Sequence, residues 1–184
     1  LGMGGSSLGA EVIYNICQLE EPHPNLIVVD TTIPESINHI LERIDLERAL
    51  FIVSSKSGAT LEPLLLYKFF KDKLKKIFEN ENELGKRFLA ITDKGTPLED
   101  LAVRDKFRYV LHNPSNIGGR YSVLSFFGLI PAVLCGVNLE SLINKAKFME
   151  EESKCTDLDS NSSARLGAFM AAMVASGKDK MTLV

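Results

Sequence analysis

Cysteine is scarce in this sequence, and its few positions form no pattern. The 184 residues include three cysteines, Cys17, Cys135 and Cys155, and no two of them form a Cys-x-x-Cys pair. An odd number of widely spaced cysteines suggests neither a disulfide framework nor a zinc site. We therefore expect a protein of a reducing, cytoplasmic compartment that holds no metal.

The sequence also lacks an excess of positive charge and an apolar run long enough to cross a membrane. Its formal net charge is -3 and its isoelectric point is about 5.7, so there is no broad basic field to attract nucleic acid. The longest apolar run, 123–137, is shorter than the roughly 20 residues of a membrane-spanning helix and contains Pro131, so we expect a buried core helix there. Neither nucleic acid nor a membrane is an expected partner, and no signal peptide is found.

Short β-branched runs alternate with segments of 3.6-residue periodicity in the first part of the chain. Strands are predicted at 25–30, 50–54, 87–93 and 107–111, and helices at 6–19, 36–44 and 60–78. This alternation predicts an α/β fold, a three-layer sandwich in which helices flank a parallel sheet with right-handed crossovers. With a first strand that lies mostly upstream of Leu1, the predicted sheet has five strands.

The pattern after residue 111 is helical. Helices are predicted at 122–137 with a kink near Pro131, at 139–154 and at 161–175, followed by a strand that begins at Met181. Both ends of the chain look cut, so we expect a piece of a longer protein. One domain is expected at 1–155, and 156–184 is expected to be a helix and strand that lead to a second domain.

Hydroxyl side chains gather where one predicted strand gives way to a helix. Ser55, Ser57 and Thr60 lie within six residues, with Gly58 between them, and the helix is expected to begin about Ala59. A helix N-terminus carries free N–H groups and a partial positive charge, so hydroxyls there favour an anion such as phosphate. The stretch lacks G-x-x-x-x-G-K-[ST] spacing, which argues against a nucleoside triphosphate. A serine-rich helix cap is the simpler alternative.

The glycine-rich stretch Gly2–Gly9, GMGGSSLG, lies where the first strand turns into the first helix. Ligands of parallel sheets bind beyond the carboxyl ends of the strands, so this turn is expected to face the same crevice as the hydroxyl cluster. Glycine permits unusual dihedrals and a close approach of the backbone to a ligand. A dinucleotide site is the alternative, but the spacing does not match G-x-G-x-x-G, and Asp30 is too common a residue type to support it.

A third loop at this edge, Asn113–Ser122, carries a cationic side chain. Gly118 and Gly119 precede Arg120, so the backbone can turn tightly and aim the guanidinium into the crevice. A structural arginine paired with a surface acid is the alternative. His112 ends a strand near the crevice and is the only one of the three histidines for which a catalytic role is an alternative, but we expect a loop or supporting role for it.

Three motifs in this order, G-x-G-G-S-x-x-G, S-[KS]-S-G-x-T-x-E and G-G-R-Y-S, resemble those of the glucose-6-phosphate isomerase family. The middle motif is shared by the wider class of sugar isomerase (SIS) domains, whereas the stretch 116–132, NIGGRYSVLSFFGLIPA, resembles the isomerase itself. The residues at 179–184 resemble the entry to that enzyme's second SIS domain. The details are more similar to prokaryotic forms, including those fused to a transaldolase, and they imply a flavodoxin-like SIS fold.

The resemblance implies roles for individual residues. The family's phosphate binders correspond to Ser6, Ser55, Ser57, Thr60 and the backbone N–H of Lys56. Its substrate-binding glycines correspond to Gly5 and Gly119, its arginine beside the sugar carbonyl to Arg120, and its glutamate that holds a partner subunit's ring-opening histidine to Glu62. The pair Gly58-Ala59 departs from the family, because many members carry a bulkier pair with a second threonine.

The function implied by the resemblance is the reversible isomerisation of glucose 6-phosphate and fructose 6-phosphate, a cofactor-free step of glycolysis and gluconeogenesis carried out by a homodimer. The reaction passes through a cis-enediolate, and Arg120 suits the developing oxyanion because it cannot lose its proton. By resemblance, the base glutamate, the ring-opening histidine and a lysine lie downstream of Val184, so the chain alone would bind a sugar monophosphate without turnover. Two alternatives stay open: a non-catalytic phosphosugar-sensing module, and an isomerase of another aldose phosphate.

Overall fold

The computed structural model describes residues 1–182, which divide into two compact units. The first unit is Leu1–Asn138, and the second begins at Leu139. The first holds the helical elements η1 (Gly4–Ser6), α1 (Leu8–Ile16), α2 (Pro34–Arg43), α3 (Leu61–Leu74), α4 (Glu81–Gly85), α5 (Pro97–Arg104), η2 (Gly119–Leu124) and α6 (Phe126–Leu134). The expected domain at 1–155 remains a prediction.

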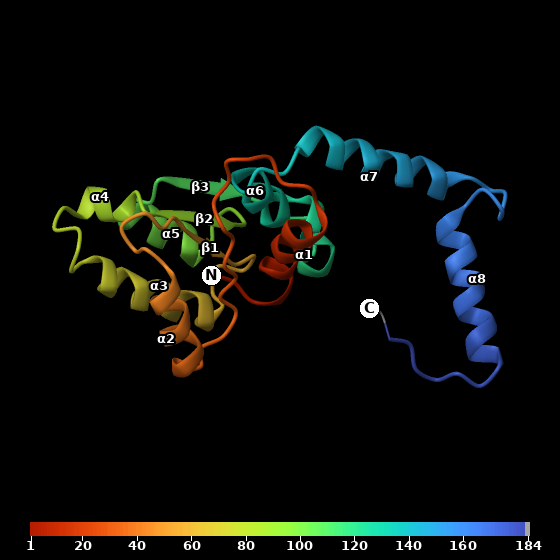
Figure 1. Cartoon of the computed structure of the whole chain (residues 1–184), viewed down its shortest axis with the longest axis horizontal. Coiled ribbons are helices and arrows are strands. Elements are labelled where there is room, and N and C mark those ends of the chain that lie inside the picture. Colours follow the sequence, from red (N-terminus) through yellow and green to blue (C-terminus); the bar gives the residue numbers. More distant parts are fainter. Residues whose placement is uncertain (183–184) are drawn as a thin grey trace. The chain divides into compact units, whose positions relative to one another are not determined.

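A parallel sheet of three strands forms the centre of the first unit (Figure 1). The strand β1 (Phe51–Ser54) pairs with β2 (Phe88–Thr92), and β2 pairs with β3 (Tyr109–His112). All five residues of β2 are buried, as expected for a strand that is covered on both faces. The bounds of the three strands lie within two residues of the predicted runs, and the carboxyl ends of all three meet at one edge of the sheet.

The predicted sheet had five strands, and this prediction is wrong for residues 1–182, where the sheet has three. The segment 25–30 has no regular secondary structure. Leu1 and Gly2 link this segment to β1: the amino group of Leu1 donates to the carbonyl of Ile52 at 2.7 Å, and the N–H of Gly2 donates to the carbonyl of Val29 at 3.3 Å. A ladder needs successive bonded pairs in register, and one such bond is too few to join 25–30 to the sheet.

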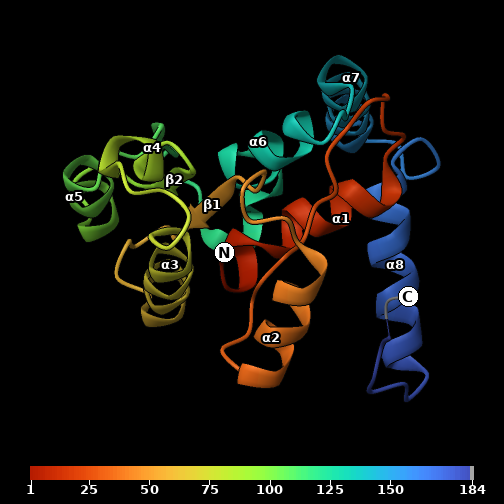
Figure 2. The same ribbon diagram turned by 60° about the vertical axis from the view of Figure 1, so that its left-hand side comes forward.

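The core of the first unit brings α3 and α5 onto the sheet. It includes Phe51 and Val53 of β1, Phe88 and Ala90 of β2, Leu66, Tyr67, Phe70 and Leu74 of α3, Leu98 and Ala102 of α5, and Phe107. Five of these side chains are aromatic and form contacts with ring centroids 4.8 to 5.4 Å apart. Figure 2 shows α3 beside β1, with α5 on the β2 side. This packing fixes the helices whose first turns follow the carboxyl ends of β1 and β2.

Two segments are more broken than their patterns predicted. The helix expected at 6–19 is the 3₁₀ turn η1 followed by α1, and the helix expected at 122–137 is the 3₁₀ segment η2 followed by α6. The break at Ser125 has a local cause, since its hydroxyl donates to the carbonyl of Ser122 at 2.7 Å and competes with helical hydrogen bonding. Pro131 lies inside α6, which is only partly the buried helix expected, because Phe127, Gly128, Pro131 and Ala132 are buried whereas Phe126, Val133 and Leu134 are exposed.

The second unit contains α7 (Leu139–Lys154) and α8 (Ser162–Ala175). Asn161 joins them: its side-chain oxygen accepts from the N–H of Ala164 at 2.8 Å, and its amide donates to the carbonyls of Ser153 and Cys155 at 3.0 and 2.8 Å. A strand was predicted to begin at Met181; residues 181–182 have no regular secondary structure, and 183–184 lie outside the described residues.

Candidate functional site

The hydroxyl cluster predicted after β1 is present in the structure. The hydroxyl of Ser55 donates to that of Thr60 at 3.0 Å, and the hydroxyls of Ser57 and Thr60 lie 3.4 Å apart. The backbone N–H of Gly58 donates to Ser55 at 3.1 Å, and that of Ala59 donates to Ser57 at 3.3 Å. Three uncharged side chains are therefore held together by one turn of backbone.

The start of α3 leaves amide groups available beside this cluster. The helix begins at Leu61, two residues later than predicted, and Thr60 is its N-cap. The side chain of Thr60 makes no capping hydrogen bond, because its hydroxyl pairs with Ser55 instead. The first-turn N–H groups of a helix are donors without intrahelical partners and carry a partial positive charge. The turn can hold an anion with neutral donors.

The backbone of Gly58 explains why a larger residue is missing from this turn. Gly58 has a φ of +64°, a left-handed conformation that other residues rarely adopt. A side chain there would also collide with Thr96, whose Cβ lies 2.5 Å from the position of an added Cβ. A side chain at position 58 would therefore require both an unfavourable φ and a movement of Thr96.

The side chain of Lys56 connects the loops that follow all three strands. Its ammonium lies 2.5 Å from Oδ2 of Asp93, which follows β2, and it donates at 2.9 Å to the carbonyl of Ser115, which follows β3. The backbone N–H of Asp93 also donates to the carbonyl of Lys56 at 3.2 Å. The sequence did not single out Asp93, because its partner is 37 residues away.

The glycine-rich turn and the arginine loop meet directly. A Cβ added to Gly5 would collide with the backbone of Gly119, whereas one added to Gly119 would meet no atom within 4 Å. The buried hydroxyl of Ser122 lies 2.8 Å from the carbonyl of Gly5 and 2.6 Å from that of Gly119, and shares its proton between them. The structure thus brings the two predicted substrate-binding glycines together, with Ser122, which the sequence did not single out, as their link.

Arg120, the predicted cation, has an exposed side chain next to this contact. Its guanidinium has no hydrogen-bond or ion-pair partner among residues 1–182. The alternative of an arginine paired with a surface acid is therefore not observed in this part of the chain. Ser6 ends the turn η1 and is half-buried, and Glu62 lies half-buried in the first turn of α3. Their roles remain predictions.

The imidazole of His112 is paired with a carboxylate. Its Nε2 lies 2.7 Å from Oε1 of Glu99, and the other oxygen of Glu99 accepts from the N–H of Gly95 at 2.5 Å. The hydrogen bond from Gly95, followed by that from His112, lowers the pKa of Glu99. This supporting arrangement connects β3 to the start of α5.

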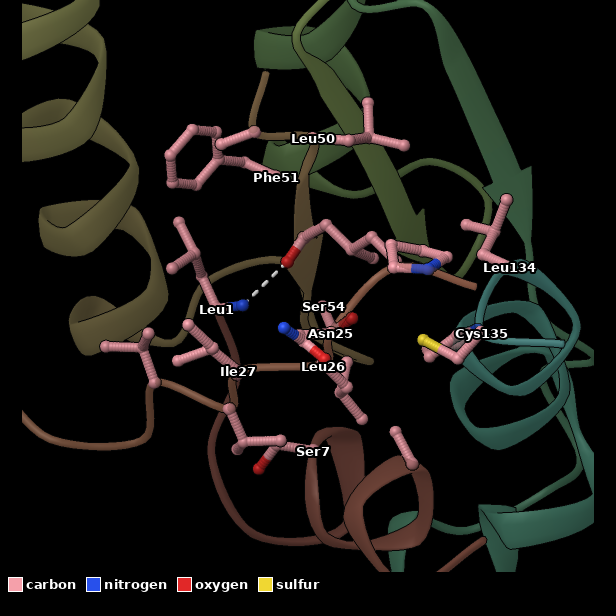
Figure 3. Close-up of a pocket in the computed structure, with 18 of the residues that line it drawn as sticks. Leu1, Ser7, Asn25, Leu26, Ile27, Leu50, Phe51, Ser54, Leu134 and Cys135 are labelled. Atoms are coloured by element: carbon pink, nitrogen blue, oxygen red, sulfur yellow. Dashed lines mark hydrogen bonds between the residues drawn. The ribbon is translucent and has the colours of Figure 1, made fainter. Parts of the chain in front are cut away.

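A cavity of about 260 Å³ lies at the outer edge of β1 (Figure 3), and Ser6, one of the predicted phosphate binders, is among the residues that line it. Leu26, Ile27, Leu50 and Leu134 contribute to its mostly apolar wall, and the amino group of Leu1 points to the carbonyl of Ile52. The lining also includes the polar side chains of Ser6, Ser7 and Arg48, and we assign no ligand to this cavity.

Residues 1–182 contain neither a membrane-spanning helix nor a cluster of metal ligands. Every helix in this part of the chain is too short or too polar to span a lipid bilayer. The same residues contain no group of three or more His, Cys, Asp or Glu side chains arranged to hold a metal ion.

Comparison with known proteins gives consistent matches. Residues 1–180 match the family model described as phosphoglucose isomerase. The chain is 36% identical over 157 residues to a glucose-6-phosphate isomerase of Campylobacter jejuni, covering 83% of this chain and 37% of that protein. It is 34% identical over 165 residues to a probable glucose-6-phosphate isomerase of Methanococcus maripaludis, covering 88% of this chain and 36% of that one.

Solved structures give the same result. A hypothetical protein from Thermus thermophilus matches 93% of this chain and 40% of its own, with a TM-score of 0.82 and 27% identity. A glucose-6-phosphate isomerase from Chlamydia trachomatis matches 94% of this chain and 33% of its own, with a TM-score of 0.77 and 26% identity. The chain therefore spans between about a third and two fifths of the length of these relatives.

Proposed function

This chain belongs to the phosphoglucose isomerase family, and we propose that it supplies the sugar-phosphate-binding part of an enzyme that interconverts glucose 6-phosphate and fructose 6-phosphate. The observation that carries the proposal is the meeting of the hydroxyl turn after β1, the glycine-rich turn and the Arg120 loop at one edge of the sheet. Ligands of parallel sheets bind at this edge.

The phosphate is assigned to the hydroxyl turn. Ser55, Ser57 and Thr60 with the backbone N–H of Lys56 provide neutral donors, and Ser6 adds a hydroxyl from the glycine-rich turn. Neutral donors hold the dianion without placing a competing charge at the reacting end of the sugar. Binding energy gained at the phosphate then orients the carbonyl end for reaction.

The carbonyl end of the sugar is assigned to Gly119 and Arg120. Isomerisation moves a proton between adjacent carbons through a cis-enediolate, so negative charge develops on an oxygen at this end. A guanidinium stays protonated throughout and stabilises that charge, an effect typically of about 3 kcal/mol or roughly 100-fold in rate. Gly5 is assigned to holding Gly119 in place through their backbone contact.

The remaining steps need a carboxylate base and a group that opens the sugar ring. Glu62 lies in the first turn of α3, where its role in the proposal is to orient a ring-opening histidine of a second subunit, in a homodimer. Because the chain spans only a part of its relatives' length, we do not assign turnover to residues 1–184 alone. We propose that the whole protein, of which this chain supplies the sugar-phosphate-binding part, carries out the isomerisation in the cytoplasm.

Calorimetric titration of the chain tests this assignment. We expect binding of glucose 6-phosphate, fructose 6-phosphate and 6-phosphogluconate, whose carboxylate places a negative charge where the enediolate would carry it. Arg120→Ala should weaken the binding of 6-phosphogluconate by about 10- to 100-fold, which corresponds to the loss of one charge-assisted hydrogen bond. The same variant should weaken the binding of inorganic phosphate by less than about 2-fold.

Arg43→Ala, which removes an exposed arginine of α2, is the matched control and should change neither affinity. Equal losses for 6-phosphogluconate and inorganic phosphate in Arg120→Ala would contradict the assignment of Arg120. Tighter binding of ribulose 5-phosphate than of either hexose phosphate would favour an isomerase of another aldose phosphate.

A further inference from the structure

The ammonium group of Lys56 connects the Arg120 loop, Asn113–Ser122, to the turn at 55–60. This turn, to which the phosphate is assigned, is called the phosphate turn below. The side chain of Lys56 begins in the turn after β1 and ends between Oδ2 of Asp93 and the carbonyl of Ser115. Both side chains of the ion pair are mostly buried, with 29% of Lys56 and 17% of Asp93 exposed. The ammonium is therefore committed to the protein rather than presented as a free cation for a ligand.

Ser115 lies at the start of the loop that leads to Arg120, and a second contact fixes the other end of that loop. Lys56 holds the carbonyl of Ser115 at 2.9 Å, and Ser122 holds the carbonyl of Gly119 at 2.6 Å. Arg120 directly follows the second contact. Loss of either contact would let the guanidinium move relative to the phosphate turn.

Asp93 holds the ammonium of Lys56 in the position from which it donates to the carbonyl of Ser115. One of its oxygens pairs with Lys56, and the other, Oδ1, is the one buried side-chain oxygen or nitrogen without a partner in the described part of the chain. A buried polar atom of this kind costs free energy and calls for a functional explanation. The carboxylate is retained at that cost because it fixes the direction of the Lys56 side chain.

We propose that Asp93 is a positioning residue, which orients Lys56 so that the ammonium fixes the Arg120 loop at a set distance from the phosphate turn. The Asp93–Lys56–Ser115 contact is called the tie below. The proposal rests on the proposed function, because it gives the tie a role in binding a ligand that reaches from the hydroxyl cluster to Arg120. The ligand class is a sugar monophosphate with a negative or polarised oxygen at its far end.

The variant Asp93→Asn separates this role from a simple effect of charge. Removing a negative charge near the site strengthens the attraction of every anion, so a purely electrostatic role predicts tighter binding of both inorganic phosphate and 6-phosphogluconate. A positioning role predicts an unchanged or tighter affinity for inorganic phosphate, and an affinity for 6-phosphogluconate that is about 10-fold weaker.

A double-mutant cycle identifies the group through which Asp93 acts. In an Arg120→Ala background, Asp93→Asn should change the affinity for 6-phosphogluconate by less than about 2-fold, because the loop no longer carries the cation. Asp100→Asn, at an exposed acid of α5, is the matched control for net charge and should leave the ratio of the two affinities unchanged. An undiminished 10-fold effect without Arg120 would overturn the proposal.

Two further measurements cover the other outcomes. If Asp93→Asn does not fold, the double variant Lys56→Met/Asp93→Asn leaves no unpaired charge, and it should show the same selective loss of 6-phosphogluconate. If the unaltered chain binds no anion, the proposed function fails. Amide hydrogen exchange then tests separately whether Asp93 and Lys56 hold the Arg120 loop in place. Faster exchange of the amides at 115–121 in Asp93→Asn, with α3 unchanged, supports the tie; equal exchange overturns it.

Discussion

The contact between Gly5 and Gly119 predicts a strong asymmetry between two similar substitutions. A Cβ on Gly5 would overlap the carbonyl carbon and oxygen of Gly119, which are backbone atoms that no rotamer change can move. A Cβ on Gly119 would enter open space, and Gly119 does not have a left-handed φ. Gly5→Ala should therefore destabilise the first unit, and Gly119→Ala should not.

The magnitude for Gly5→Ala follows from two contributions. Overpacking against an immobile neighbour costs about 1 to 3 kcal/mol. Separation of the two glycines also removes the shared hydrogen bond of Ser122, which contributes about 1 kcal/mol. We expect a loss of about 2 to 4 kcal/mol in the free energy of unfolding, against a change of less than about 1 kcal/mol for Gly119→Ala.

Urea denaturation followed by far-UV circular dichroism measures both values, since the chain has no tryptophan to serve as a fluorescent reporter. Gly118→Ala, at a loop glycine of the same unit whose φ of −68° suits alanine and whose added Cβ would make only an ordinary contact with Tyr121 at 3.5 Å, is the control for the general effect of replacing glycine. Equal losses for Gly5→Ala and Gly119→Ala, or an unchanged stability for Gly5→Ala, would refute the assigned backbone contact.

Three other predictions concern stability. Burial alone would raise the pKa of Asp105, but hydrogen bonds from Lys71, Tyr67 and Arg104 outweigh it and lower the pKa to about 2. The ionised carboxylate of Asp105 contributes roughly 1 to 2 kcal/mol, after solvent screening, to the free energy of unfolding; this contribution is present above pH 4 and is lost as the pH falls towards 2. Between pH 4 and 2 the free energy of unfolding of Asp105→Asn should therefore fall less steeply than that of the unaltered chain. Lys106, which directly follows Asp105, the C-cap of α5, has a φ of +54° and donates its N–H to the carbonyl of Val103. Lys106→Gly should therefore raise the free energy of unfolding, measured in urea, by about 0.5 to 1 kcal/mol; a decrease would contradict strain at that position. Gly58→Ala should lower it by about 2 kcal/mol or more and disrupt phosphate binding, and a normal affinity would show that the turn tolerates a side chain.

The sequence was most informative where neighbours along the chain decide the structure. Ser55, Ser57 and Thr60 lie within one turn, so their spacing sufficed to predict that they cluster. The buried run of β2 likewise needed only its own apolar residues. Local chemistry of this kind is visible without knowing what packs against it.

The rest depended on partners that are distant in the sequence. The segment 25–30 has strand-like residues, but a strand exists only where a neighbour pairs with it, and Gly2 provides a single bond. Asp93 and Ser122 are ordinary residue types until Lys56 and Gly5 are brought to them by the fold. Such tertiary contacts have no signature in one sequence.

The phosphate turn consists of groups that neither gain nor lose protons in the physiological range. The hydroxyls of Ser55, Ser57 and Thr60 hydrogen-bond one another, and the amides beside them are equally unaffected by acid or base. A sugar monophosphate changes from monoanion to dianion near pH 6. Binding to this turn would therefore follow the ionisation of the ligand, so that the molecule in solution rather than the protein would act as the sensor of acidity.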